Sequence, residues 1–208
     1  TKVFGGCIAA FTRKLAPREQ AEFLMRLDTR LYWLHGETAI AANHGLHPKH
    51  HVMNYHDFFT ARLGPTDTVI DLGGGVGALG GSIATRTGAR VTGMEISEPT
   101  LEKARARAEK LAGRQHLQFI RGDITTDRAP GTYSAVVLSN VLEHLQNRVE
   151  LLKKWQTWYG ATKFLIRVPA LDRDWRVAWK KELGVEWRLD ETHETEYTRD
   201  QLLAELDE

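Results

Sequence analysis

One stretch, residues 68–80, constrains the fold more than any other part of the chain. It begins as a short apolar, β-branched run over residues 68–72, which is typical of a buried parallel strand. The run breaks into glycines and continues with small and apolar residues to Ala84, which predicts a helix. A glycine loop between a strand and a helix N-terminus offers backbone N–H groups to a ligand and lets it approach closely. The stretch therefore predicts a ligand site.

Two registers of this loop predict two classes of ligand. Gly75-x-Gly77-x-x-Gly80 matches the dinucleotide fingerprint, and Glu95 lies at about the distance of the acid that holds a ribose in such sites. The other register, Asp71-x-Gly73-x-Gly75-x-Gly77, has an acid at the end of the strand. A single glycine fingerprint does not decide between these two ligand classes, so the choice depends on the rest of the chain.

The chain alternates predicted strands and helices from residue 65 onward. The expected strands are residues 68–72, 89–96, 117–120, 133–138 and 163–169. This alternation predicts an α/β fold, a doubly wound (Rossmann-like), mostly parallel sheet with helices on both faces. The carboxyl ends of these strands, with Asp71, Glu95, Asp123, Asn140 and Pro169, are expected along one edge of the sheet, where ligands bind in such folds.

An N-terminal helical extension precedes this sheet. Residues 17–42 predict one or two helices with an apolar stripe, at Leu24, Leu27, Leu31 and Leu34. Residues 43–51 break the helix and carry four histidines, which we interpret as a solvated loop or a lid over the ligand rather than a metal site. Residues 51–63 resume a helical pattern that contains Tyr55, either a core aromatic or a pocket residue. We expect a helical cap or lid over residues 1–64 and a ligand-binding domain over residues 65–208.

Composition excludes several classes of function. The 28 Lys and Arg residues nearly balance the 27 Asp and Glu residues, so no overall field favours nucleic acid or an anionic membrane. No apolar run approaches the roughly 20 residues that span a bilayer. The single Cys7 fits a reducing compartment. A cytoplasmic protein is expected.

The order of Asp71 and the glycine loop, Glu95, Gly122-Asp123-Ile124 and Asn140-Val141-Leu142-Glu143-His144 resembles class I S-adenosylmethionine-dependent methyltransferases over residues 48–170. The likeness is nearest to the bacterial group that methylates small molecules and sugars. It implies that Gly73, Gly75 and Gly77 lie along the amino-acid end of S-adenosylmethionine and that Asp71 receives its ammonium. It also implies Glu95 on the ribose, Asp123 and Ile124 on the adenine, and Asn140 near the sulfonium. Ile96 and Tyr55 complete the candidate cofactor-binding residues.

The segment that begins at Asn140 also resembles the Glu-x-x-Glu-His signature of metal-assisted methyltransferases. Asn140 stands where those relatives have the first Glu, so we assign no metal site and leave a divalent metal open. Glu143, His144 and His193 are the candidate catalytic residues, with His144 as a general base or all three as metal ligands. The alternative is that Glu143 and His144 only shape the pocket.

The segment after the last predicted strand begins at the ligand edge. Arg173, Asp174, Trp175 and His193 are therefore candidates for contact with the methyl acceptor. The alternative is that Trp175 and Trp179 pack a helix onto the sheet while the charged side chains remain solvated. The resemblance implies two more strands after residues 201–206, and none is evident. We expect missing residues or a sheet completed by a partner chain in a homo-oligomer.

These patterns together predict an enzyme that transfers a methyl group from S-adenosylmethionine to oxygen or nitrogen of a small molecule, such as a sugar or a natural-product intermediate. An NAD(P)-dependent oxidoreductase is the alternative from the first register. A cofactor-binding module without turnover is the third hypothesis.

Overall fold

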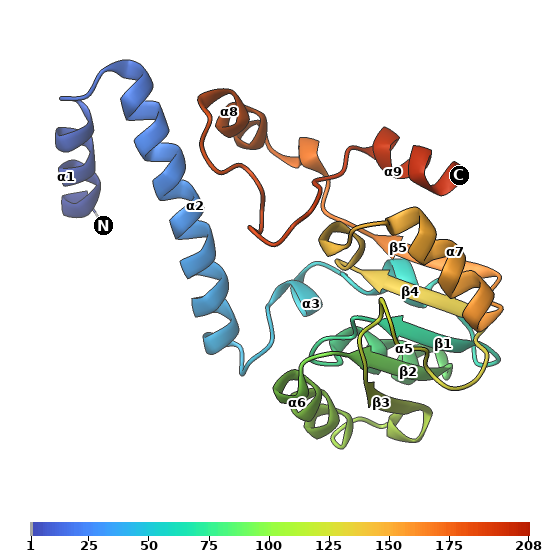
Figure 1. Cartoon of the computed structure of the whole chain (residues 1–208). Coiled ribbons are helices and arrows are strands. Elements are labelled where there is room, and N and C mark those ends of the chain that lie inside the picture. The colour runs from blue at the N-terminus through green and yellow to red at the C-terminus, as the bar shows by residue number, and fades with distance from the viewer. Residues whose placement is uncertain (1) are drawn as a thin grey trace. The chain divides into compact units, whose positions relative to one another are not determined.

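The computed structural model describes residues 2–208, with the side chain of Arg173 excepted (Figure 1). The chain divides into two compact units. The first consists of the N-terminal segment up to His47 and of Pro169–Arg199, and the second of Pro48–Val168 and Asp200–Glu208. The predicted boundary between residues 64 and 65 stays a prediction.

The second unit is built on a five-stranded parallel sheet with the order β3-β2-β1-β4-β5. The strands are β1 (Thr68–Leu72), β2 (Arg90–Glu95), β3 (Leu117–Arg121), β4 (Ala135–Ser139) and β5 (Lys163–Arg167). The predicted α/β fold class is confirmed. Because the chain winds outward from β1 to β2 on one side and passes to β4 on the other, the strand order reverses between β1 and β4. That reversal is the place where open α/β sheets bind ligands.

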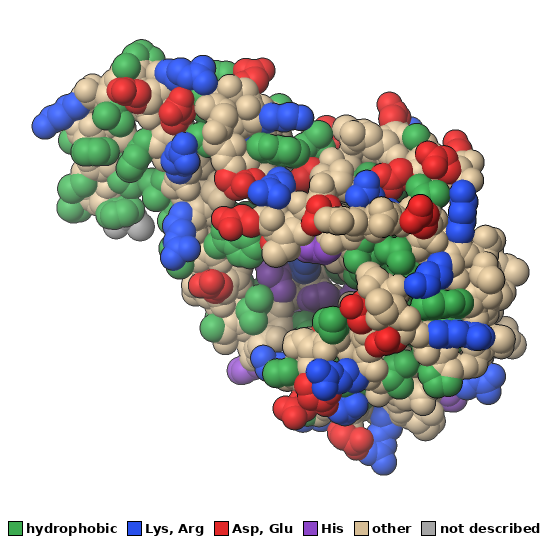
Figure 2. Space-filling model, viewed as in Figure 1, with side chains coloured by type: hydrophobic (Ala, Val, Ile, Leu, Met, Phe, Trp, Pro, Cys, Tyr) green, Lys and Arg blue, Asp and Glu red, His purple; other side chains and the backbone are tan. Residues whose placement is uncertain are grey.

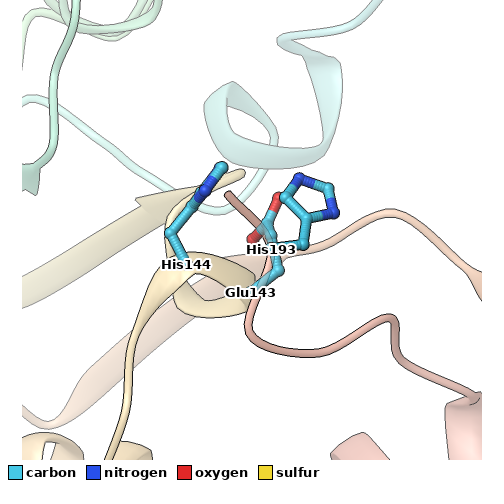
Figure 3. A group of neighbouring side chains, drawn as sticks. All are labelled: Glu143, His144 and His193. Carbon is cyan, nitrogen blue, oxygen red and sulfur yellow. The ribbon is translucent and has the colours of Figure 1, made fainter. Parts of the chain in front are cut away.

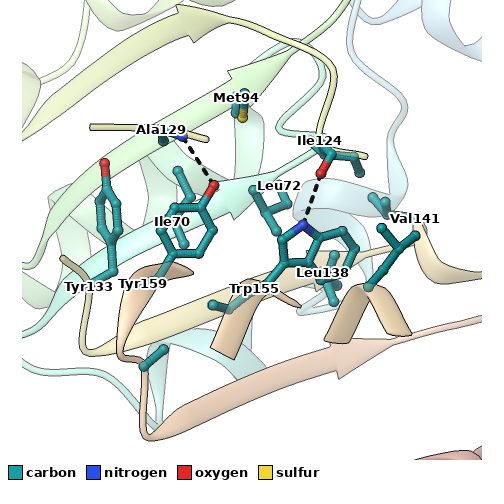
Figure 4. Close-up of a cluster of buried hydrophobic side chains, with 13 residues drawn as sticks. Ile70, Leu72, Met94, Ile124, Ala129, Tyr133, Leu138, Val141, Trp155 and Tyr159 are labelled. Atoms are coloured by element: carbon teal, nitrogen blue, oxygen red, sulfur yellow. Dashed lines mark hydrogen bonds between the residues drawn. The ribbon is translucent and has the colours of Figure 1, made fainter. Parts of the chain in front are cut away.

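Helices cover both faces of this sheet. Alternate residues of each strand point to opposite faces, so both faces present apolar side chains to the helices that pack on them. On one face, Ile70, Leu72 and Leu138 pack with Trp155 and Tyr159 of α7 (Arg148–Tyr159), and the indole of Trp155 donates a 2.9 Å hydrogen bond to the carbonyl of Ile124 (Figure 4). The other face packs against α4 (Asp57–Thr60) and α5 (Ala78–Thr87). The unit also contains α3 (Lys49–Val52), α6 (Glu98–Ala108), η1 (Arg114–His116) and η2 (Leu142–His144), and α9 (Arg199–Asp207) begins at its boundary.

The predicted helix over residues 51–63 is wrong. The chain forms the short helices α3 and α4, and a turn separates them. Asn54 adopts the left-handed conformation (φ 48°) in this turn, which a continuous helix does not allow. Val52 and Met53 are consequently 68% and 71% exposed, whereas Tyr55 and His56 are buried.

The first unit contains α1 (Lys2–Thr12), the long helix α2 (Pro17–Ala42), η3 (Leu171–Arg173) and α8 (Trp175–Leu183). Asp28 of α2 accepts hydrogen bonds of 2.8 Å from both Arg176 and Lys180 of α8, which ties the two helices together. The helix predicted over residues 17–42 is confirmed as α2. No residue of α2 is buried in the described chain, and Leu31 and Leu34 of its apolar stripe are exposed. Apolar side chains also gather on the surface of α1 (Figure 2).

Within residues 2–208 no strand follows β5, and no helix has the length and apolar character that crossing a membrane requires.

Candidate functional site

A pocket of about 220 Å³ opens at the carboxyl ends of β1 and β4, within the second unit. We call it the loop pocket, because the glycine loop, residues 73–77, forms one of its walls. The opposite wall comes from α3 and the turn after it. Its lining residues are Lys49, His50, Tyr55, Asp71, Gly73, Gly74, Gly75, Val76, Ala78, Leu79, Ser139 and Asn140.

The glycine loop depends on backbone conformations that other residues rarely adopt. Gly73 and Gly77 both have φ of 73°, and a Cβ on Gly77 would lie 2.6 Å from Cζ of Phe119. A Cβ on Gly73 would lie 2.7 Å from Cγ2 of Val141. Glycine is thus needed here for the turn and for close packing, which leaves the start of α5 open toward the pocket.

Asp71 is the last residue but one of β1, and its carboxylate is buried inside the second unit. Its Oδ2 atom has no hydrogen-bond partner among the described residues, although almost all buried polar atoms in proteins have one. Burial, and then the negative charge of Glu95, raise the pKa of Asp71 to about 7. A cationic ligand group in the loop pocket would supply the missing partner and favour the ionised form.

Glu95 ends β2, and the backbone fixes both of its carboxylate oxygens. Oε2 accepts a 3.1 Å hydrogen bond from the amide of Gly75, and Oε1 accepts one of 2.9 Å from the amide of Ser97. A carboxylate oxygen has two lone pairs, so both oxygens can still accept from a ligand. The neighbouring Ile96 is 59% exposed, which leaves its side chain available for contact.

Asp123 and Ile124 follow β3 and differ in exposure. Oδ1 of Asp123 accepts hydrogen bonds from the amide and the hydroxyl of Thr125 at 2.8 and 2.7 Å. These bonds lower the pKa of Asp123, so its carboxylate is ionised and can accept from an amino group. Ile124 is buried in the core beside Trp155.

Tyr55 and Asn140 meet at the loop pocket. The Tyr55 hydroxyl donates a 2.7 Å hydrogen bond to Oδ1 of Asn140, whose backbone is left-handed (φ 57°). The Arg167 guanidinium lies 3.5 Å from the centroid of the Tyr55 ring and donates a 2.8 Å hydrogen bond to the Tyr55 carbonyl. Tyr55 is therefore both a buried aromatic and a pocket residue, which joins the two interpretations that the sequence left open.

The candidate catalytic residues belong to different units. Glu143 and His144 lie on η2, where Glu143 is buried (Figure 3). His193 belongs to the first unit, where its Nδ1 lies 2.9 Å from Oε1 of Glu196 and both side chains are buried. The expected joint action of His193 with Glu143 and His144 stays a prediction.

The candidate acceptor residues follow β5 in the first unit. Asp174 caps α8 and accepts hydrogen bonds from Arg176, which lower the pKa of its carboxyl to about 2. The Trp175 side chain is 70% exposed, and its role toward the acceptor or the sheet stays a prediction. The side chain of Arg173 lies outside the described part of the chain.

Sequence reasoning missed three residues that surround the loop pocket or stack on its wall, Lys49, His50 and Arg167. The histidine-rich segment gave a partial signal, because we interpreted it as a loop or lid near the ligand. Arg167 ends a strand at the ligand edge, and this position was its only signal.

Residues 69–159, from β1 to the end of α7, match the family model of the methyltransferase domain. This stretch of the chain is therefore similar to a methyltransferase domain. The loop pocket, Glu95 and Asp123 lie at the ligand edge of that domain, whereas Lys49, Tyr55 and Arg167 lie outside the matched residues.

Two curated relatives are similar to parts of this chain. A protein named probable (S)-tetrahydroprotoberberine N-methyltransferase 2, from Papaver bracteatum, is 30% identical over 106 residues, which are 50% of this chain and 29% of that protein. The ubiquinone biosynthesis O-methyltransferase of Idiomarina loihiensis is 32% identical over 85 residues, 41% of this chain and 35% of that protein. The chain thus spans about a third of the length of the curated relatives it matches.

Solved structures show the same fold at low sequence identity. NcsB1, an O-methyltransferase from neocarzinostatin biosynthesis, is similar with a TM-score of 0.59 and 18% identity, over 77% of this chain and 48% of that one. YcgJ from Bacillus subtilis is similar with a TM-score of 0.57 and 16% identity, over 74% and 67% of the two chains.

Proposed function

We propose that the protein transfers a methyl group from S-adenosylmethionine to an oxygen or nitrogen of a small-molecule acceptor. The buried Oδ2 of Asp71, without a partner among the described residues, is the observation that carries this proposal. A ligand ammonium is the group that would satisfy it, and the amino-acid end of S-adenosylmethionine supplies one. A dinucleotide has no such group at this place.

The residues at the sheet edge fit the rest of this cofactor. Glu95 would accept from the ribose hydroxyls, and Asp123 from the adenine amino group, with Ile96 and Ile124 next to the ring. Gly73, Gly75 and Gly77 would follow the methionine part, and Tyr55 with Asn140 would lie near the sulfonium. When bound, the cofactor supplies a methyl group already activated by the positive sulfur, so the protein mainly has to position the acceptor.

We further propose that the acceptor is a sugar or a natural-product intermediate. Glu143, His144 and His193 would orient it or remove its proton, and Asp174 and Trp175 would contact it. The support is chemical, because these are residues that hydrogen-bond, take up protons or stack on a ring. The proposal includes no divalent metal, and the acceptor assay below is run with and without Mg²⁺.

Calorimetric titration with S-adenosylhomocysteine, with NADH in parallel, tests the cofactor. Micromolar binding of S-adenosylhomocysteine alone is the expected result. Binding of NADH alone would select the oxidoreductase instead. After the expected result, a panel of hydroxyl and amine acceptors with and without Mg²⁺ tests turnover, and a lack of methyl transfer to every acceptor would favour a binding module.

A further inference from the structure

The loop pocket carries a positive charge in addition to the negative charge of Asp71. Lys49 of α3 lines this pocket together with Asp71, Tyr55 and the glycine loop. All of these residues belong to the second unit. A pocket of about 220 Å³ thus presents one ammonium and one carboxylate to whatever enters it.

The position of Lys49 is tied to the wall of the pocket. Its Nζ atom lies 4.9 Å from the centroid of the Tyr55 ring, which fits a cation–π contact. The Arg167 guanidinium contacts the same ring at 3.5 Å, and the Tyr55 hydroxyl is bonded to Asn140. Tyr55 therefore fixes both cations close to the end of β4, and two positive groups near one ring favour an anion there.

The electrostatics of the two pocket charges are complementary. Burial, followed by the charge of Arg167, lowers the pKa of the Lys49 ammonium, while the charge of Glu143 acts in the opposite direction. Burial and Glu95 raise the pKa of Asp71. Each group would hold its charge more firmly next to a ligand charge of the opposite sign. A free α-amino acid group, with an ammonium and a carboxylate on one carbon, supplies both.

We propose that Lys49 binds the α-carboxylate of the cofactor, so that Lys49 and Asp71 together recognise the amino-acid zwitterion of S-adenosylmethionine. This inference rests on the proposed function and adds a residue 20 positions before the first residue of the family match, at residue 69. It assigns a specificity role to α3. The pocket selects ligands that carry the complete amino-acid group over the same nucleoside without it.

Two commercial probes separate this role from binding of the nucleoside. S-adenosylhomocysteine carries the amino-acid group, and 5′-methylthioadenosine has the same thioether nucleoside without it. The experiment measures the dissociation constants of both probes by calorimetry for the full chain and for Lys49→Met, which keeps the aliphatic stem and removes the charge. Lys49→Arg is the conservative rescue, and Lys103→Met, on the exposed side of α6, is the matched control.

We expect Lys49→Met to weaken S-adenosylhomocysteine binding roughly tenfold or more and to change 5′-methylthioadenosine binding less than about twofold. Lys49→Arg should recover most of the loss, and Lys103→Met should resemble the unmodified protein. An equal loss for both probes, or no loss for S-adenosylhomocysteine, would overturn the assignment while leaving the proposed function intact. If the unmodified protein binds neither probe, the proposed function fails, and this inference fails with it.

Discussion

The hydroxyl of Tyr55 donates a 2.7 Å hydrogen bond to the side-chain carbonyl of Asn140, 85 positions further along the chain. The bond joins the turn after α3 to the end of β4. Asn140 is in the left-handed conformation, and its amide donates a 2.8 Å hydrogen bond to the carbonyl of Arg167, so its backbone is fixed as well. The wall of the loop pocket that α3 and the turn after it form is therefore bonded to the carboxyl end of β4.

Replacing Tyr55 by Phe should loosen this wall. The change removes one hydrogen bond and leaves the ring in place, so we expect the affinity for S-adenosylhomocysteine to fall by about 1 kcal/mol. Tyr133→Phe is the matched control, because Tyr133 donates a 2.9 Å bond to Pro130 and lies outside the residues that line the loop pocket. Calorimetry should show a loss for the first variant alone, and equal affinities would contradict a role of this bond in the pocket.

Replacing Glu95 by Ala tests the ribose assignment. We expect cofactor binding to weaken by about 1–3 kcal/mol, because a charged acceptor is lost and two backbone amides lose their partner. Glu98→Ala, which breaks exposed ion pairs with Arg105 and Arg121, should leave the affinity unchanged. A folded Glu95→Ala protein with undiminished affinity would refute the assignment.

The sequence placed Asp71, Glu95 and Asp123 at the carboxyl edge of the sheet for a simple reason. A parallel strand is a local pattern, and topology alone brings the carboxyl ends of parallel strands to one edge. A residue at or just after the end of a strand can thus be placed without knowledge of any side-chain contact. The roles of these three residues toward a ligand stay predictions.

The pocket wall opposite the glycine loop could not be found in this way. Lys49 and Arg167 lie 118 positions apart in the sequence, and both contact the Tyr55 ring, which follows the turn at Asn54. A helical pattern over residues 51–63 hides that turn, since Asn is not excluded from helices. The periodicity of residues 17–42 predicted the helix α2 correctly, but periodicity identifies an apolar face and not whether anything covers it.

Replacing Gly77 by Ala should destabilise the second unit. The residue has φ of 73°, which costs a residue with a Cβ about 1–2 kcal/mol, and the new Cβ would displace the Phe119 ring. Gly64→Ala is the control, since it has open space around it, and it should change the free energy of unfolding by less than about 0.5 kcal/mol. Urea denaturation measures both variants, and equal midpoints would show that the loop tolerates a side chain.

Asp71 should couple ligand binding to proton release. Its pKa is raised to about 7 by burial, so the carboxyl of the free protein holds a proton over much of the range between pH 4 and pH 7, in which the unfolded chain has lost it. The contribution of this carboxyl to the stability of the ligand-free fold is therefore complete below about pH 4, and it is lost progressively as the pH rises to about 7. A ligand ammonium favours the ionised carboxylate, so its binding should expel the proton.

Calorimetry in two buffers of different ionisation enthalpy measures this proton. At pH 6, binding of S-adenosylhomocysteine should release about one proton from Asp71, and at pH 8 close to none, because the carboxyl is then already ionised. The comparison with 5′-methylthioadenosine isolates the proton released by Asp71, since a ligand without an ammonium does not favour the ionised carboxylate. Equal release by the two ligands at pH 6 would mean that the proton comes from another group, and the assignment of Asp71 to the ammonium would then be wrong.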